Sequence, residues 1–185
     1  MSTDAIVMLR DDHKEIRKLI RACRAAADGQ DRPAGADTGG TADTADTGGG
    51  TPAAEAVKEL LHLLSVHTYL EDEVMYPRAR RLVPETGGTV LRFHEEHHVA
   101  DVLAGELEAM DSRDEGYAAK AAVLMDAVER HMKAEEEGWF PQVRAAVGRK
   151  ELQAIGARMA ELRELAPQRP RRTLLRKVAD ALSAA

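Results

Sequence analysis

The chain is poor in cysteine and has no long hydrophobic run. Its single cysteine, Cys23, excludes a disulfide framework and a zinc site built from several thiolates. Cys23 is in helical register with Leu9, Ile16 and Ile20, so we interpret it as a buried apolar residue. No apolar stretch approaches the length that crosses a bilayer, so we expect no membrane-spanning segment.

An excess of positive charge and a secretory signal are also missing. The formal net charge of −6 argues against a nucleic-acid-binding protein, which usually carries a basic surface. The first residues lack both the charged region and the long apolar region of a signal peptide. We therefore expect a cytoplasmic protein, and a monomer, that binds neither nucleic acid nor membrane.

Aromatic residues make up only 3% of the chain, whereas alanine, leucine, glutamate and arginine are abundant. This composition is typical of helical proteins, and 185 residues suffice for one domain with its own core. Apolar residues at helical spacing predict long helices over residues 4–27, 53–76, 89–110 and 117–139, and shorter ones over 149–165 and towards the C-terminus. The fold that we predict is all-α: an antiparallel up-down four-helix bundle with additional C-terminal helices.

Two segments depart from this pattern. Residues 28–52 are rich in glycine, threonine and aspartate and have almost nothing to bury, which predicts a mobile surface insert. Residues 167–185 contain several arginines and predict a basic C-terminal tail. We expect the bundle, with its insert, to occupy residues 1–166 and the tail to follow it.

One motif occurs twice, at His67–Pro77 and at His131–Pro141. Each copy reads histidine, glutamate four residues on, a second glutamate at six, an aromatic residue at nine and proline at ten. A spacing of four returns to the same face of a helix, so each copy presents an imidazole beside a carboxylate. The proline predicts a bend or the end of each helix.

The helix before each copy offers one further histidine. Two acidic residues precede His13, and apolar residues follow it at +3, +6, +7 and +10; His97 has the same surroundings, which makes it the counterpart of His13. His94 and His98 remain alternatives to His97 as the ligand from this helix, because they are four residues apart and could together bind a metal ion. A bundle with pseudo-two-fold symmetry would bring both helix pairs together at its centre. The predicted metal ligands are His13, His67, Glu71, His97, His131 and Glu135.

Other residues of the motif are predicted to orient the ligands or to pack around them. We predict that Asp72, Glu73, Glu136 and Glu137 are solvated carboxylates or carboxylates that orient the imidazole N–H groups. We predict that the aromatic residues pack at the end of the bundle: Tyr76, Trp139 and Phe140.

Four imidazoles and two carboxylates buried together would cost several kcal/mol per ionised group without a metal ion. Imidazole and carboxylate suit iron, manganese, zinc or copper, and the lack of thiolates disfavours iron–sulfur clusters. A closed zinc site needs about four ligands, so six candidates favour two ions bridged by both carboxylates. With a bridging oxo or hydroxo group added, about two octahedral positions stay open for small molecules.

At these residues the sequence resembles the hemerythrin-like (HHE cation-binding) family, over about residues 4 to 142. The resemblance implies an up-down bundle around a non-haem centre of two iron ions, oxo- or hydroxo-bridged, with the six residues above as ligands. Phe93 stands where oxygen-carrying hemerythrins have an additional histidine. Glu135 follows His131 by four residues instead of an aspartate by five, a pattern similar to that of bacterial hemerythrin-like proteins.

This variant of the family implies reaction with hydrogen peroxide, O₂ or nitric oxide. We therefore expect a catalase- or peroxidase-type oxidoreductase with a role in oxidative stress. The alternative is a non-enzymatic module that senses, binds or stores O₂ or iron.

Overall fold

The computed structural model describes residues 4–30 and 51–166, and every regular element in these residues is helical. The predicted all-α class is therefore confirmed. The α-helices are α1 (Ala5–Gln30), α2 (Pro52–Leu70), α3 (Tyr76–Leu82), α4 (Gly87–Ala109), α5 (Tyr117–Ala134), α6 (Phe140–Ala146) and α7 (Arg149–Arg163). No helix in this part of the chain is both long and apolar enough to cross a membrane.

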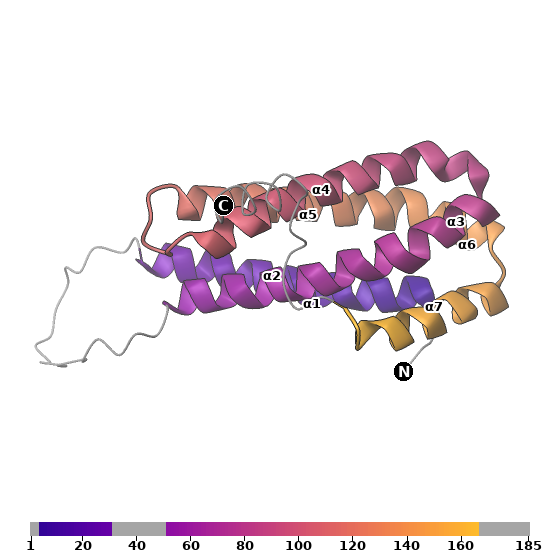
Figure 1. Cartoon of the computed structure of the whole chain (residues 1–185), viewed down its shortest axis with the longest axis horizontal. Helices are drawn as coiled ribbons and strands as arrows, with labels where there is room; N and C mark the ends of the chain where they lie inside the picture. Colours follow the sequence, from indigo (N-terminus) through magenta and orange to yellow (C-terminus); the bar gives the residue numbers. More distant parts are fainter. Residues whose placement is uncertain (1–3, 31–50, 167–185) are drawn as a thin grey trace, which may run out of the picture.

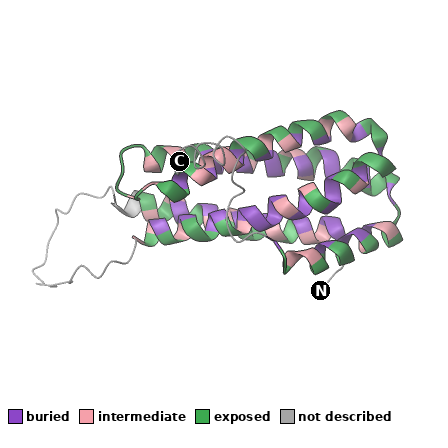
Figure 2. Ribbon diagram, viewed as in Figure 1, coloured by how far each residue is buried: buried purple, intermediate pink, exposed green. Residues whose placement is uncertain are grey.

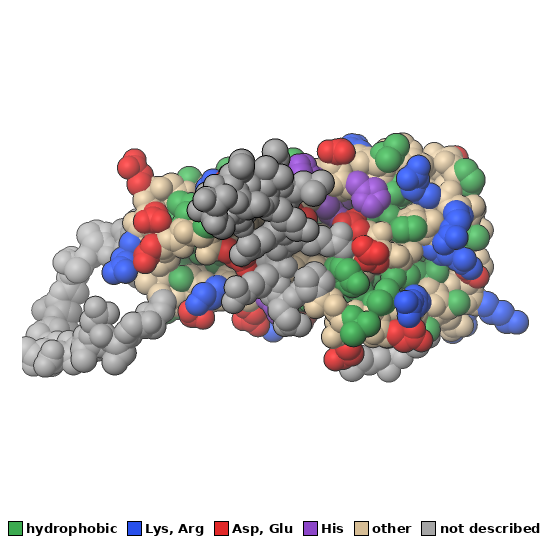
Figure 3. All heavy atoms as spheres, viewed as in Figure 1, with side chains coloured by type: hydrophobic (Ala, Val, Ile, Leu, Met, Phe, Trp, Pro, Cys, Tyr) green, Lys and Arg blue, Asp and Glu red, His purple; other side chains and the backbone are tan. Residues whose placement is uncertain are grey.

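The long helices lie side by side (Figure 1). Helix α1 packs along α2 and α4 packs along α5, while α1 also contacts α5 and α2 contacts α4. Helix α7 lies against α1 and α2. The buried residues follow the inward face of each helix and the exposed residues the outward face (Figure 2), as expected for amphipathic helices. On the face shown in Figure 3, acidic and basic side chains are interspersed.

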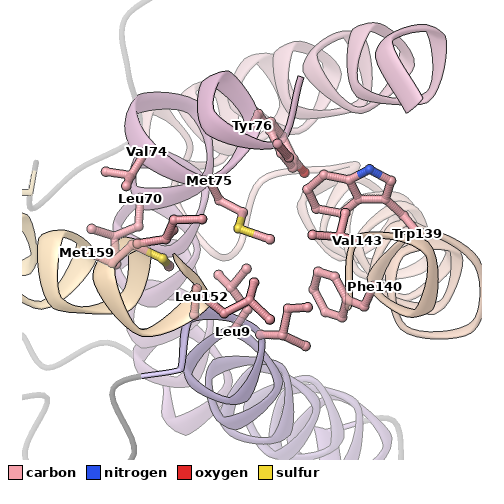
Figure 4. Close-up of a cluster of buried hydrophobic side chains, with 14 of the residues drawn as sticks. Leu9, Leu70, Val74, Met75, Tyr76, Trp139, Phe140, Val143, Leu152 and Met159 are labelled. Atoms are coloured by element: carbon pink, nitrogen blue, oxygen red, sulfur yellow. The ribbon is translucent and has the colours of Figure 1, made fainter. Parts of the chain in front are cut away.

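The apolar core consists of two clusters with a polar layer between them. The first contains Leu9, Leu70, Phe93 and Trp139 (Figure 4 shows most of its larger members), and the second is built around side chains such as Leu124. The chain enters the second cluster from the first along α1 and α4, and returns to the first along α2 and α5. Each of these helices therefore crosses the polar layer once, which is where the predicted metal ligands lie.

The boundaries of the insert differ slightly from the prediction. Helix α1 continues to Gln30, and α2 begins at Pro52 after Thr51, whose hydroxyl accepts a hydrogen bond from the Ala54 N–H at 3.3 Å. Such a cap satisfies one of the free donors at a helix start. Residues 31–50 of the predicted insert and the whole predicted tail, 167–185, lie outside the described residues.

Neither motif proline ends its helix. A π-helical turn precedes each proline, η1 (Glu71–Met75) and η3 (Glu135–Trp139), and the chain then continues as α3 and α6. Each proline stands in the first turn of the new helix, where its missing N–H costs little. A 3₁₀ turn, η2 (Pro84–Thr86), connects α3 to α4, which begins at Gly87, two residues before the predicted start at 89.

Candidate metal centre

The six predicted ligands come together in the polar layer, and all six are buried. They form two overlapping groups, and within each group one ligand atom per residue lies within 4.8 Å of the others. The first group contains His13, His67, Glu71 and Glu135, and the second contains Glu71, His97 and His131. Glu71 belongs to both groups, so its carboxylate lies where it can bridge two ions.

The Nε2 atoms of the four imidazoles face the carboxylates. His67 Nε2 and His97 Nε2 lie 3.3 and 3.4 Å from Oε2 of Glu71. His13 Nε2 and His131 Nε2 lie 3.3 and 3.6 Å from Oε2 of Glu135. Each carboxylate therefore lies between imidazoles that come from two different helices.

Several of these atoms are buried without a hydrogen-bond partner. They are His13 Nε2, both ring nitrogens of His67, Glu71 Oε1 and Glu135 Oε2. Buried polar atoms are nearly always hydrogen-bonded, because an unsatisfied one costs free energy. All of these atoms except His67 Nδ1 face the middle of the polar layer, and nitrogen and oxygen atoms arranged in this way fit a metal cation. The residues present therefore suit the ions that the sequence predicts.

On the outer side, each imidazole faces a second carboxylate. Three Nδ1–H groups donate hydrogen bonds: His13 to Glu136 at 2.8 Å, His97 to Asp72 at 3.0 Å and His131 to Glu96 at 2.7 Å. The fourth, His67 Nδ1, lies 3.5 Å from Asp12 Oδ2. Carboxylates in this position hold the ring with Nε2 towards a metal and make it a stronger ligand.

Cationic side chains support this outer ring of carboxylates. Arg17 donates two hydrogen bonds to Glu136, at 3.0 and 2.9 Å, and Arg163 donates one to Asp12 at 2.8 Å. Arg92 pairs with Glu96 at 3.4 Å. The fourth outer carboxylate, Asp72, lies 3.0 Å from Nδ1 of His94.

The sequence motifs predicted two of the four outer carboxylates. Asp72 and Glu136 occupy the predicted orienting positions, whereas Glu73 and Glu137 are exposed. Asp12 and Glu96 were missed in this role, although each directly precedes a predicted ligand histidine in the sequence. Their function depends on the neighbouring helix, because each faces the histidine of the other helix in its pair.

The three histidines of α4 have different surroundings. His97 is buried among the atoms of the second group. The His94 side chain is about one-third exposed and lies behind Asp72, and His98 is exposed. The structure thus groups His97, and neither alternative, with the other five predicted ligands.

Tyr76 was predicted to pack at the end of the bundle, but its hydroxyl reaches the candidate centre. The hydroxyl donates a hydrogen bond to Glu135 Oε1 at 2.8 Å and lies 3.4 Å from Nε2 of both His97 and His131. Its ring stacks on His97, just as Phe140, its counterpart in the repeat, stacks on His13. Phe140 and Trp139 are buried apolar residues of the first cluster, as expected.

Burial and the neighbouring charges shift the protonation of these groups. Burial lowers the pKa of His67 to about 4, which keeps its imidazole neutral and able to ligate at neutral pH. Burial and the charge of Glu135 raise the pKa of Glu71 well above its usual value. Burial alone would also raise the pKa of Glu135, but the imidazoles, His131 foremost, outweigh it and lower that pKa to about 2. Without a cation, Glu71 therefore keeps its proton to a higher pH than a free carboxyl would.

The helical fold and the polar layer together define the class of protein. It is an all-helical protein with a buried histidine–carboxylate site suited to metal cations. The family model described as the hemerythrin HHE cation binding domain matches residues 4–143. The chain belongs to this family, which confirms the resemblance drawn from the sequence motifs.

A solved structure agrees at the level of the fold. The crystal structure of a hemerythrin HHE cation-binding domain-containing protein from Mycobacterium kansasii superposes with a TM-score of 0.62 at 20% sequence identity. The match covers 88% of this chain and 86% of that one. A comparison with curated proteins found no match.

Proposed function

We propose that the protein is a non-haem di-iron protein that binds and reacts with small oxidants: hydrogen peroxide, O₂ or nitric oxide. Its activity towards peroxide is of the catalase or peroxidase type. The six residues predicted from the motifs would hold the ions through the imidazoles of His13, His67, His97 and His131 and the carboxylates of Glu71 and Glu135. When bound, the iron pair supplies the redox chemistry that peroxide breakdown requires.

The observation that carries this proposal is the membership of Glu71 in both groups of potential ligand atoms. One ion needs no second, overlapping set of imidazoles, whereas two adjacent ions need a shared ligand between them. The absence of a thiolate from both groups favours iron, manganese or zinc over an iron–sulfur cluster. Among these metals the family resemblance favours iron.

The chain contributes three further things to this chemistry. The outer carboxylates orient the imidazoles, and their negative charge partly neutralises the positive charge of the bound ions. The apolar clusters pack against the polar layer at both of its ends and hold the helices that carry the ligands in place. The Tyr76 hydroxyl provides a proton beside Glu135, and the pKa of this phenol is raised well above its ordinary value by burial and by the charges of Glu135 and Glu71, so it keeps that proton at neutral pH.

We also propose the finer architecture that the sequence predicts. Residues 1–166 form one antiparallel up-down four-helix bundle in which α7 covers one side, and residues 167–185 form a separate tail. The alternation of α1, α2, α4 and α5 between the two apolar clusters supports the antiparallel order.

The first test is metal analysis of the protein loaded with iron, together with oxygen release after addition of hydrogen peroxide. We expect about two irons per chain and the balanced conversion of two peroxides into two waters and one O₂, faster than with free iron. Glu71→Gln removes the shared carboxylate and should reduce both iron content and turnover. Glu73→Gln, the same change at an exposed position two residues away, should preserve both.

Two outcomes would overturn parts of this proposal. One iron or none per chain would contradict the shared-ligand arrangement. Two irons without peroxide turnover, together with absorption bands that change reversibly with O₂, would favour the non-enzymatic sensing or binding module.

A further inference from the structure

A cavity of about 460 Å³ adjoins the candidate centre on the side of α2, α4 and α5. Three of the six predicted ligands form part of its wall: His67, His97 and His131. Each comes from a different helix, so the cavity reaches the place where those helices converge. A molecule in it would lie directly beside the centre.

The middle of the cavity is apolar. Leu64, Ala100, Val128 and Met132 line it and are buried, and Ala127 contributes another small side chain. The short alanine side chains on facing helices leave room that larger residues would fill. An apolar wall of this kind offers hydrogen peroxide no hydrogen bonds, but it suits a hydrocarbon group.

The cavity is also much larger than the oxidants proposed above. A water molecule takes up about 30 Å³ of the liquid, and hydrogen peroxide is only slightly larger. Cavities of roughly 300–1,000 Å³ are those in which proteins hold small organic molecules. The volume therefore matches an organic substrate better than hydrogen peroxide, O₂ or nitric oxide.

The mouth is polar and carries both signs of charge. Arg130 and Glu95 lie there and are exposed, and within the described residues neither makes an ion pair. Val99, which is 52% exposed, adds an apolar edge. A mouth with both charges does not select for an ionic substrate, whereas the apolar interior selects for a hydrocarbon body.

We propose that this cavity binds the apolar body of an organic hydroperoxide, with its –OOH end at the three histidines. The inference rests on the proposed function and names a substrate class for the same centre. The O–O bond of the hydroperoxide breaks and the products are an alcohol and water. The two electrons and two protons come from a small organic reductant of the ascorbate type, which is oxidised to dehydroascorbate.

Binding and turnover are tested separately. Binding of 2-phenyl-2-propanol, the alcohol product of cumene hydroperoxide, is followed by chemical-shift changes of methyl groups in the iron-free protein. Turnover of cumene hydroperoxide and of hydrogen peroxide is followed in the iron-loaded protein with ascorbate. We expect the alcohol to shift the methyl signals of Ala127, Val128 and Met132, and both peroxides to be reduced.

Variants that fill the cavity should lower the turnover of cumene hydroperoxide much more than that of hydrogen peroxide. Ala127→Phe narrows the interior and should lower kcat/KM for cumene hydroperoxide by about tenfold or more, while the value for hydrogen peroxide changes by less than about twofold. Ala122→Phe, on the exposed face of the same helix and outside the cavity wall, should change neither. If Ala127→Phe impairs folding, Val99→Trp at the mouth replaces it, with Val123→Trp as its control at 55% exposure outside the wall.

The results distinguish a failure of the cavity proposal from a failure of the proposed function. No methyl shift with the alcohol, or equal effects of the cavity and control variants, would overturn the cavity proposal. If the alcohol binds only after deletion of residues 167–185, the occupant is the chain's own C-terminus, which also overturns it. Alcohol binding in a protein that turns over neither peroxide would overturn the proposed function and leave the cavity as a site for an organic ligand.

Discussion

At the scale of single residues, the candidate centre is a set of paired groups in which each imidazole lies between two carboxylates. Inside, its Nε2 faces Glu71 or Glu135, and outside its Nδ1 faces Asp12, Asp72, Glu96 or Glu136. The inner carboxylates are fully buried, whereas the outer ones are partly exposed, and three of them pair with an arginine. The outer residues can therefore be changed without leaving a buried charge alone.

Glu136→Gln tests the orienting role of the outer carboxylates. The change weakens the hold on His13 and the pairing with Arg17, and the affinity of the protein for iron should fall roughly 10–100-fold. Competition with a chelator of known affinity measures this. Glu137→Gln, one residue further on at an exposed position, should leave the affinity unchanged. Equal affinities in the two variants would show that the outer carboxylate does not act on the ligand.

Tyr76→Phe tests the phenol in the centre. Loss of its hydroxyl leaves Glu135 Oε1 without its 2.8 Å donor, which should lower the free energy of unfolding of the iron-free protein by roughly 1–3 kcal/mol. Urea unfolding gives this value. Tyr117→Phe is the control, since Tyr117 is only partly buried and its hydroxyl makes no hydrogen bond with the described residues. A similar loss in both variants would mean that the effect does not come from Glu135.

At the scale of elements, the two π-helical turns determine the direction in which the side chains after each ligand glutamate point. In an α-helix, with 3.6 residues per turn, the residue five positions on points well away from the first. A π turn closes after about five residues: the Tyr76 N–H bonds to the Glu71 carbonyl, and the Phe140 N–H to that of Glu135. Tyr76 is thereby returned towards the side of Glu71, which a strictly α-helical interpretation of the motif does not predict.

Helix α7 supports the end of the assembly near the first cluster. Its Met159 is fully buried there, among the side chains shown in Figure 4. Met159 is not a member of either group of potential ligands. Its contribution should therefore concern stability and not metal binding.

Met159→Ala should lower the free energy of unfolding by about 2–5 kcal/mol, because it leaves a cavity in a packed core. The iron content per chain should stay the same at a temperature where the variant is folded. Thermal unfolding and metal analysis measure the two quantities. Arg158→Ala, at an exposed position of the same helix, should change stability by less than about 0.5 kcal/mol. A loss of iron in folded Met159→Ala would show that α7 also controls the centre.

At the scale of the whole molecule, the polar layer destabilises the metal-free protein. It separates two apolar clusters and contains buried polar atoms that lack a hydrogen-bond partner. Stability, protonation and metal binding are therefore linked, and the linkage can be measured as a dependence of unfolding on pH.

The iron-free protein should lose stability as the pH rises from neutrality towards the raised pKa of Glu71. Glu71, with its raised pKa, keeps a proton in the folded state that the unfolded chain has already released, so its contribution falls as the pH approaches the folded pKa. The slope is at most about 1.4 kcal/mol per pH unit. His67 adds no slope in this range, because its folded pKa of about 4 and its unfolded pKa both lie below pH 7.

Urea unfolding at several pH values gives the slope. Glu71→Gln, which resembles the protonated carboxyl, should remove it, and so should bound iron, because the metal replaces the proton. A flat profile in the iron-free protein would contradict a proton held by the carboxylate pair.

The sequence by itself determined the helical class, the doubled motif and the six residues that converge, because spacing along one helix decides which side chains share a face. Through the repeat it also favoured His97 over His94 and His98, which it left open as alternatives. Only the tertiary structure decided that Asp12 and Glu96 serve histidines on neighbouring helices, that Tyr76 reaches Glu135, and that a cavity opens beside three histidines. These features depend on the register and rotation of one helix against another and on the π turns, which a periodic pattern along a single segment does not encode.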